Sequence, residues 1–168
     1  MTRTIETSLG LLLVAGILSS APGAAAGERA TLELARADTA AGAAIAACRA
    51  DGYAVAAAVV DRNGELIAYQ KGDGSTPHTR FSSMRKAYTV ATLGPIFKFH
   101  ELGAFVAKVA GKPEGQAIAS LPDILLLAGA AAIVDKGEIV GAVGVGGAPG
   151  GDKDEACAKQ AVAALKAD

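Results

Sequence analysis

The sequence contains no tryptophan, and aromatic residues make up only 4% of the chain. Proteins that bind single-stranded nucleic acid use aromatic side chains as stacking platforms for the bases. The sequence also lacks an excess of charge of either sign, because the net charge is only −1. A chain without a basic excess has no electrostatic surface for a phosphate backbone or an anionic membrane. The composition therefore argues against nucleic acid as a partner.

Long apolar runs and clustered cysteines are also missing. The run Leu9–Leu18 has no charged residue, but it is shorter than the roughly 20 residues that a membrane-spanning helix needs. Cys48 and Cys157 are the only cysteines, whereas a structural zinc site needs closely spaced pairs of ligands. The sequence therefore predicts neither a transmembrane span nor a zinc cluster.

The N-terminal segment has the three parts of a secretory signal peptide. Arg3 precedes the apolar run, and the small residues Ala24, Ala25 and Ala26 follow Pro22. Such an order is typical of a segment that is removed after export. We expect residues 1–26 to be cleaved and residues 27–168 to form a single domain, located in the periplasm or secreted.

The remaining sequence alternates between helix and strand patterns. Apolar residues recur at helical spacing in several segments, and the Val-rich run before Asn63-Gly64 is typical of a strand that enters a hairpin. Gly94-Pro95 should break the helical region in the middle, and Leu121–Gly129 fits either a strand or a helix. The expected helices are Thr31–Asp51, Thr79–Thr92, Phe99–Ala110 and Lys153–Lys166, and the expected first strands are Val55–Asp61 and Glu65–Lys71.

One phrase occurs twice. "VVDRNGELIA" (Val59–Ala68) resembles "IVDKGEIVGA" (Ile133–Ala142), and each copy reads strand, tight turn, strand. Two hairpins imply at least four antiparallel strands, most simply in one meandering sheet. The predicted fold class is thus an α/β (α+β) sandwich with helices packed on an antiparallel sheet.

The glycine-rich stretch "GVGGAPGGDKDE" does not fit a nucleotide site. The dinucleotide motif G-x-G-x-x-G fails, because its sixth position from Gly144 is Pro149. Asp152 and Glu155 have the spacing of a capping box, and acids there favour the start of a helix rather than a bound phosphate. We expect this loop to be structural, and we expect Asp61 and Asp135 to cap hairpin turns.

The polar stretch "GDGSTPHTRFSSMRKAYT" is the best candidate for a binding site. It places His78 at the edge of a predicted helix whose exposed side should carry Ser82, Arg85 and Lys86. An imidazole, apolar walls and cations suit haem, which needs an axial donor and bases for its propionates. The alternative is that His78 is an exposed loop histidine without a ligand.

Other donors in and near this stretch have competing interpretations. Met84 and Tyr88 are also potential iron donors, but their helical spacing with Phe81 favours a role in the core. His100 lies in an apolar helical segment, and we expect it to be a partly buried structural residue.

Four stretches carry a resemblance to a known family: "VVDRNGELIAYQKGDG", "TPHTRFSSMRKAYTVATLG", "IVDKGEIVGAVGVGG" and "DKDEACAKQAVAAL". From about Thr31 onward, the chain resembles the GlcG/HbpS-like family of haem-binding proteins. The resemblance implies a profilin-like or PAS-like α/β sandwich and a homo-oligomer, often an octamer. It implies haem or free iron as ligand, and, for exported members, service to a membrane sensor protein. The implied cofactor-binding residues are His78, Thr79, Arg85 and Lys86, with His78 as the iron ligand. Many members have an acid near this helix start, where this chain has Phe81 and Ser82.

Three functions are compatible with this resemblance. The first is an exported haem-binding protein that senses haem or redox state or stores haem. The second is a haem-dependent enzyme with peroxidase-like or haem-degrading activity, and the third is an oligomeric scaffold that has lost haem. No acid–base pair accompanies His78 in sequence, and one imidazole cannot both ligate iron and transfer protons. We therefore favour binding without catalysis.

The same resemblance bears on the two cysteines. The family fold places the first and last helices on one face of the sheet, which would bring Cys48 and Cys157 together. The alternative is two buried, reduced thiols that behave as small apolar side chains.

Overall fold

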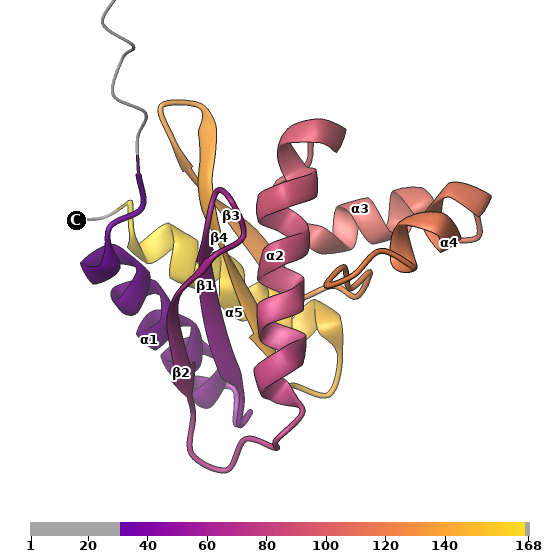
Figure 1. Ribbon diagram of the computed structural model, residues 1–168. Helices are drawn as coiled ribbons and strands as arrows, with labels where there is room; N and C mark the ends of the chain where they lie inside the picture. Colours follow the sequence, from indigo (N-terminus) through magenta and orange to yellow (C-terminus); the bar gives the residue numbers. More distant parts are fainter. Residues whose placement is uncertain (1–30, 167–168) are drawn as a thin grey trace, which may run out of the picture.

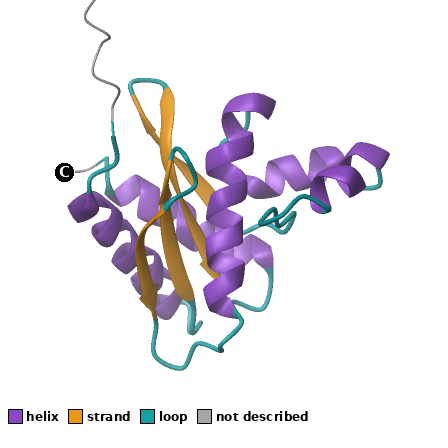
Figure 2. Ribbon diagram, in the orientation of Figure 1, coloured by secondary structure: helices purple, strands orange, loops and turns teal. Residues whose placement is uncertain are grey.

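The structure is a computed structural model that describes residues 31–166. A four-stranded antiparallel sheet carries helices on both faces (Figures 1 and 2). This arrangement confirms the predicted fold class. The elements in chain order are α1 (Leu34–Ala50), β1 (Ala56–Asp61), β2 (Leu66–Lys71), α2 (Thr79–Phe97), α3 (Leu102–Val109), α4 (Pro113–Ala119), β3 (Ala130–Asp135), β4 (Glu138–Gly146) and α5 (Gly151–Ala164).

The strand order is β2-β1-β4-β3, so the two hairpins lie side by side instead of forming a simple meander. β1 pairs with β4 through contacts such as Ala57 opposite Val145. Both central strands are almost entirely buried runs of small apolar residues, which allows helices to pack on both of their faces. β2 has a mixed burial pattern and is an edge strand.

Helices α1 and α5 cover one face of the sheet (Figure 1). A disulfide joins Cys48 of α1 to Cys157 of α5, with their Cα atoms 5.4 Å apart. Both cysteines are fully buried among alanines of the two helices. The two cysteines therefore meet as the family resemblance implies, and they form a disulfide instead of two reduced thiols.

Helix α2 covers the opposite face and lies very close to β4. A Cβ atom added at Gly144 would lie 2.6 Å from the backbone nitrogen of Ala87 and closer still to the carbonyl oxygen of Ser83. Real Cβ atoms do not approach other atoms so closely. The glycines that sequence analysis assigned to a structural role thus permit direct contact between the backbones of a helix and a strand.

The predicted break at Gly94-Pro95 is wrong, because α2 continues to Phe97. Proline removes only one backbone donor here, and the helix ends two residues later, so few hydrogen bonds are lost. Lys98 then closes the helix in the left-handed conformation, with φ 58° and ψ 58°. None of the helices within residues 31–166 is long and apolar enough to cross a membrane.

The segment after α2 also differs from expectation. His100 is exposed and precedes α3, so the prediction of a partly buried helical residue is wrong. Its carbonyl oxygen accepts a hydrogen bond from the Ala132 nitrogen at 2.8 Å, and Glu101 forms an isolated bridge with Ala131. Because residues 100 and 101 pair with the outer edge of β3, α3 begins at Leu102 instead of at Phe99. The ambiguous segment 121–129 is irregular except for its turns.

Candidate functional site

A groove runs between the edge strand β2 and helix α2. It consists of two hollows of about 340 Å³ and 520 Å³ that share Leu66, Phe81 and Met84. We call it the α2–β2 groove. Its lining residues are Val60, Gly64, Glu65, Leu66, Tyr69, Lys71, Pro77, Arg80, Phe81, Met84, Arg85, Tyr88 and Asp123.

Three large side chains of α2, those of Phe81, Met84 and Tyr88, line this groove instead of entering the core. Phe81 is 62% exposed, and Met84 and Tyr88 are half-buried. The expectation that their helical spacing marks a core face is wrong. Helix α2 buries its face of small residues, such as Ser83 and Ala87, because only small residues fit against the glycines of β4. Phe81, Met84 and Tyr88 are therefore left on the side that lines the groove.

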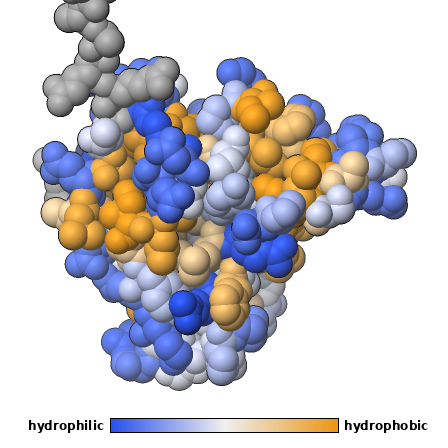
Figure 3. Space-filling model, viewed as in Figure 1, coloured by the Kyte–Doolittle hydropathy of each residue, from blue (hydrophilic) through white to orange (hydrophobic). Residues whose placement is uncertain are grey.

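Strand β2 supplies the opposite wall. Leu66 is 44% exposed, and Tyr69 and Lys71 from the same strand also line the groove. At the turn before β2, the ring of Tyr88 lies against Gly64, where an added Cβ would come within 2.5 Å of the ring. In the surface view, apolar residues gather over α1 and β2 on one side of α2 and near α3 on the other (Figure 3).

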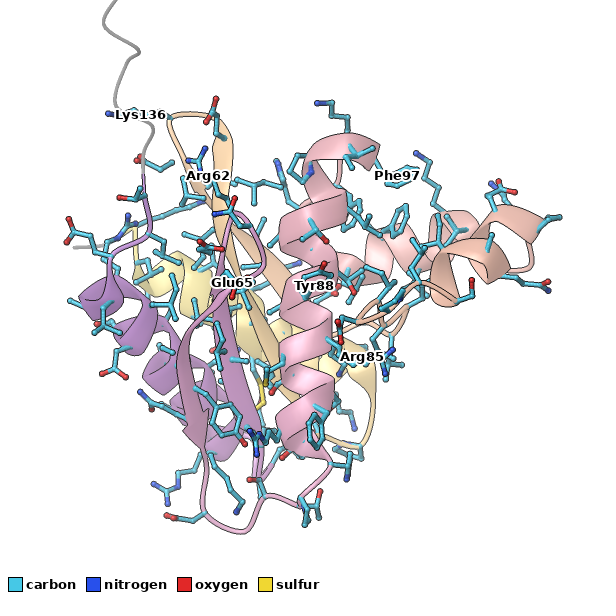
Figure 4. The ribbon with its side chains drawn as sticks, in the orientation of Figure 1. Arg62, Glu65, Arg85, Tyr88, Phe97 and Lys136 are labelled. Carbon is cyan, nitrogen blue, oxygen red and sulfur yellow. A yellow bond between two sulfur atoms is a disulfide. The ribbon has the colours of Figure 1, made fainter. Side chains whose placement is uncertain are left out.

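Two arginines of α2 place positive charge on the groove. The Arg80 guanidinium lies 5.4 Å from the centre of the Phe81 ring, so a cation adjoins the aromatic wall. Arg85 is half-buried and donates a hydrogen bond to the carbonyl oxygen of Ile124 at 2.6 Å. This bond occupies one arm of Arg85 and holds the guanidinium beside the groove. Arg85 is therefore one of the residues that line the groove, and Figure 4 shows its position on α2.

Lys86 has a different position from the one expected. Its side chain is only 2% exposed, and its Nζ atom donates to an Asp154 carboxylate oxygen at 2.7 Å and to the Val145 carbonyl oxygen at 3.0 Å. The prediction that Lys86 lies on the exposed side of the helix is wrong, because the acid of α5 pairs with it inside the molecule. Lys86 therefore does not line the groove.

Asp154 is the acidic partner in this buried pair. Burial raises the pKa of Asp154 above its ordinary value of 3.8, while the hydrogen bond and the charge of Lys86 oppose that rise. Its second carboxylate oxygen accepts a hydrogen bond from the Ala148 nitrogen at 2.9 Å. The pair therefore ties α2, β4 and the start of α5 together.

The predicted capping box at the start of α5 does not form. No side chain caps this helix end. Glu155 instead accepts hydrogen bonds from the nitrogen atoms of Gly103 and Gly129, at 2.7 and 3.2 Å. Asp61, in contrast, accepts from the Asn63 and Glu65 nitrogens at 2.7 and 2.9 Å. Its predicted role as a turn cap is therefore confirmed.

His78 and Thr79 lie at the N-terminal end of α2. His78 is exposed, and its Nδ1 atom is 3.1 Å from the hydroxyl oxygen of Thr76. It does not line the α2–β2 groove itself, although Pro77 and Arg80 on either side of it do. Thr79 is fully buried and donates to the Thr76 carbonyl oxygen at 2.6 Å. Of the four predicted site residues, only Arg85 lines the groove.

Sequence reasoning missed two acids of the groove. Glu65 follows the β1–β2 turn and Asp123 lies in the irregular segment after α4, and both line the hollow that contains Tyr88. These positions are far apart in sequence, so no spacing connects them. Within residues 31–166, no group of three or more His, Cys, Asp or Glu side chains is placed to hold a metal ion. Binding of free iron stays a prediction.

Comparison with known proteins gives a family match over most of the chain. The model of the family described as "Haem degrading protein HbpS-like" matches residues 32–163. A crystal structure of a double mutant of Streptomyces reticuli HbpS is 34% identical, with a TM-score of 0.76. The match covers 90% of this chain and 98% of that one.

Two more distant structures share the fold. The Klebsiella pneumoniae protein ORFY is 23% identical with a TM-score of 0.73, and the match covers 85% of this chain and 97% of that one. A complex of PduOC with haem is 18% identical with a TM-score of 0.69, and the match covers 80% and 95%. None of the curated proteins matches the sequence.

Proposed function

This chain belongs to the HbpS-like family, and we propose from that premise that it binds haem in the α2–β2 groove. The observation that carries the proposal is the groove itself, a hollow with apolar walls and cations at its rim. Haem has the matching chemistry, because its ring is apolar and its propionates are anionic. The residues present therefore fit the group.

Each part of the groove has a proposed role. Phe81 and Leu66 would contact the faces and edges of the ring, and Arg80 and Arg85 would pair with propionates. Met84 and Tyr88 line the groove and carry sulfur and phenol oxygen donors of the kinds that ligate haem iron. His78 is the remaining donor, outside the groove at the N-terminus of α2.

A haem titration with matched variants tests the site. We expect a Soret absorption band to develop at one equivalent of haem per chain. Phe81→Ala removes an exposed apolar wall, so it should weaken binding about tenfold without unfolding the protein. Ile96→Ala is the matched control, because Ile96 is 68% exposed on the same helix and does not line the groove. Equal haem affinity in both variants would contradict the proposal that haem binds in this groove.

The same titration identifies the axial donor. His78→Ala, Met84→Leu and Tyr88→Phe each remove one donor while leaving the apolar walls largely in place. The variant that changes the position of the Soret band, with affinity otherwise close to wild type, identifies the ligand. An unchanged spectrum in all three variants would mean that none of them ligates the iron.

Haem degradation is the second candidate function, and the family description favours it. Tyr88 and the two acids that sequence reasoning missed, Glu65 and Asp123, supply proton-transferring groups to the groove. Incubation of the haem-loaded protein with a reductant and oxygen, or with hydrogen peroxide, separates the two functions. Stable absorbance indicates binding alone, and protein-dependent loss of the Soret band indicates degradation. A protein that binds no haem would instead be a scaffold.

We also propose that the protein is exported, assembles into a homo-oligomer such as an octamer, and serves a membrane sensor. The buried disulfide supports export, because disulfides persist in oxidising compartments. The signal peptide proposed for residues 1–26 lies outside the described residues, and the sensor rests on the family resemblance alone.

A further inference from the structure

We propose that a second cavity, at the C-terminal end of α2, binds a small organic carboxylate. The cavity has a volume of about 560 Å³ and shares no lining residue with the α2–β2 groove. It is a half-open depression lined by the last turn of α2, the segment after it and the turn ends of both hairpins. We call it the hairpin-end cavity, and its lining residues are Arg62, Gly94, Pro95, Lys98, His100, Gly137, Glu138 and Ile139.

Basic side chains from three separate segments meet at this cavity. Arg62 comes from the β1–β2 turn, Lys98 from the end of α2 and His100 from the segment before α3. Glu138 is the single acid among the lining residues, and it accepts a hydrogen bond from Arg62 at 3.4 Å. The nearby carboxylate of Asp61 is occupied by the amide groups of its own turn. The lining therefore carries a net positive charge, which attracts an anion.

The backbone of Lys98 has a conformation that is unfavourable for residues other than glycine. Its φ of 58° lies in the left-handed region, where the residue after a helix is most often glycine. A cation near a helix C-terminus also interacts favourably with the helix dipole. That interaction is available from any residue of the last turn, so it does not require lysine at this strained position. Lys98 lines the cavity and therefore places an ammonium group beside it.

The floor of the cavity is apolar, and this feature selects the kind of anion. Pro95 and Ile139 lie beside Gly94, where an added Cβ would come within 2.8 Å of the Ile139 side chain. Hydrocarbon surface next to cations suits an anion that has a short carbon chain. The ammonium group of Lys98 can pair with a carboxylate, and the volume lies in the range of small-molecule sites. The cavity thus favours an organic carboxylate over an inorganic anion.

Titrations of the intact protein with butyrate, succinate and inorganic phosphate, followed by ligand-observed NMR, test the site. We expect saturable binding of at least one carboxylate and much weaker binding of phosphate. Lys98→Gly should weaken carboxylate binding about tenfold or more. The same substitution should leave the protein at least as stable, because glycine suits the left-handed conformation. A loss of binding therefore cannot be attributed to unfolding. Glu138→Gln should strengthen binding, because it removes the competing acid.

Lys136→Gly is the matched control. Lys136 also has a positive φ, of 49°, and it does not line the cavity. Figure 4 shows its side chain at the tip of the β3–β4 hairpin, directed away from α2. We expect this variant to bind carboxylates as the wild type does. Equal loss in both lysine variants would indicate only a general effect of charge and would overturn the proposal.

The inference does not depend on the proposed haem site, and haem titration keeps the two apart. Lys98→Gly should bind haem as tightly as the wild type. Loss of haem binding in this variant would assign the cavity to haem propionates and would overturn the carboxylate inference. Unchanged carboxylate affinity in Lys98→Gly, tighter binding of phosphate than of carboxylates, or no saturable binding would overturn it as well.

Discussion

Two adjacent residues of α2 have opposite environments. Arg85 is half-buried at the α2–β2 groove, whereas Lys86 is buried against Asp154 of α5. Breaking a buried ion pair by removing one partner leaves an uncompensated charge in the interior. A protein in which both partners of such a pair are replaced by apolar residues of similar size often retains its stability. Lys86 is therefore a structural cation, whereas Arg85 lines the groove that we propose as the haem site.

This difference predicts the effect of substitution. Lys86→Met should lower the free energy of unfolding by about 3–5 kcal/mol at neutral pH, because Asp154 stays buried without its partner. The double variant Lys86→Met/Asp154→Leu should regain most of that loss. Urea unfolding of the two variants and the wild type measures both effects. A double variant as unstable as the single one would show that the packing of Lys86, not its charge, is responsible.

The pKa of Asp154 predicts a pH dependence. Burial raises this pKa above 3.8. Between pH 3.8 and the folded-state pKa, Asp154 is therefore mostly protonated in the folded chain and mostly ionised in the unfolded chain. The contribution of Asp154 to stability is therefore fully present below pH 3.8 and falls as the pH rises through the folded-state pKa. Lys86 lowers the pKa of Asp154. Lys86→Met should therefore raise the folded-state pKa of Asp154 and widen the pH range over which stability falls.

Unfolding free energies of the wild type and Lys86→Met, measured from pH 3.5 to pH 7, check this prediction. The difference between the two proteins should increase as the pH rises. A difference that stays constant over this range would contradict it.

At the scale of elements, the contact between α2 and β4 controls the position of the groove. Gly144→Ala should lower the free energy of unfolding by about 1–3 kcal/mol, because the added methyl group collides with the α2 backbone. Gly42→Ala in α1 is the matched control. Its added Cβ makes only an ordinary contact, 3.5 Å from Gln70, and alanine favours a helix. Chemical denaturation should therefore give opposite signs for the two variants, and equal effects would contradict the prediction.

The disulfide between α1 and α5 gives a second prediction at this scale. It closes a loop with a sequence separation of 109 residues, for which loop entropy gives about 4–5 kcal/mol. Replacing both cysteines by alanine should lower the melting temperature clearly. In denatured, unreduced protein, thiol titration should find no free thiols, and after reduction it should find two per chain. Two thiols before reduction would show that the bridge does not form.

At the scale of the whole molecule, we predict a closed homo-oligomer. Apolar residues gather on the surface over α1 and β2 (Figure 3), and contiguous apolar patches often mark interfaces. Closed symmetry is the usual form of a homo-oligomer. Light scattering at micromolar concentration should give a mass several times that of one chain. A mass close to that of a single chain would contradict the prediction.

The sequence by itself determined the features that depend on neighbouring residues. The Asp61, Asn63 and Gly64 turn forms because one carboxylate caps the amide groups two and four positions later. The repeated phrase forms two similar hairpins, and each has a register irregularity just before its aspartate, at Val59/Val60 and Ile133/Val134. The fold class and the family followed from such local patterns, because turns and periodicity are local properties of a chain.

Only the tertiary structure decided which of these features meet. Helical periodicity assigned Phe81 and Tyr88 to the core, but the glycines of β4 pack against Ser83 and Ala87, which leaves Phe81 and Tyr88 at the groove. The burial of Lys86 depends on Asp154, which lies 68 residues later in the chain. Spacing along a helix defines its faces, but packing against distant segments determines what covers each face. The groove therefore exists only because β2 and α2 lie next to each other in the folded chain.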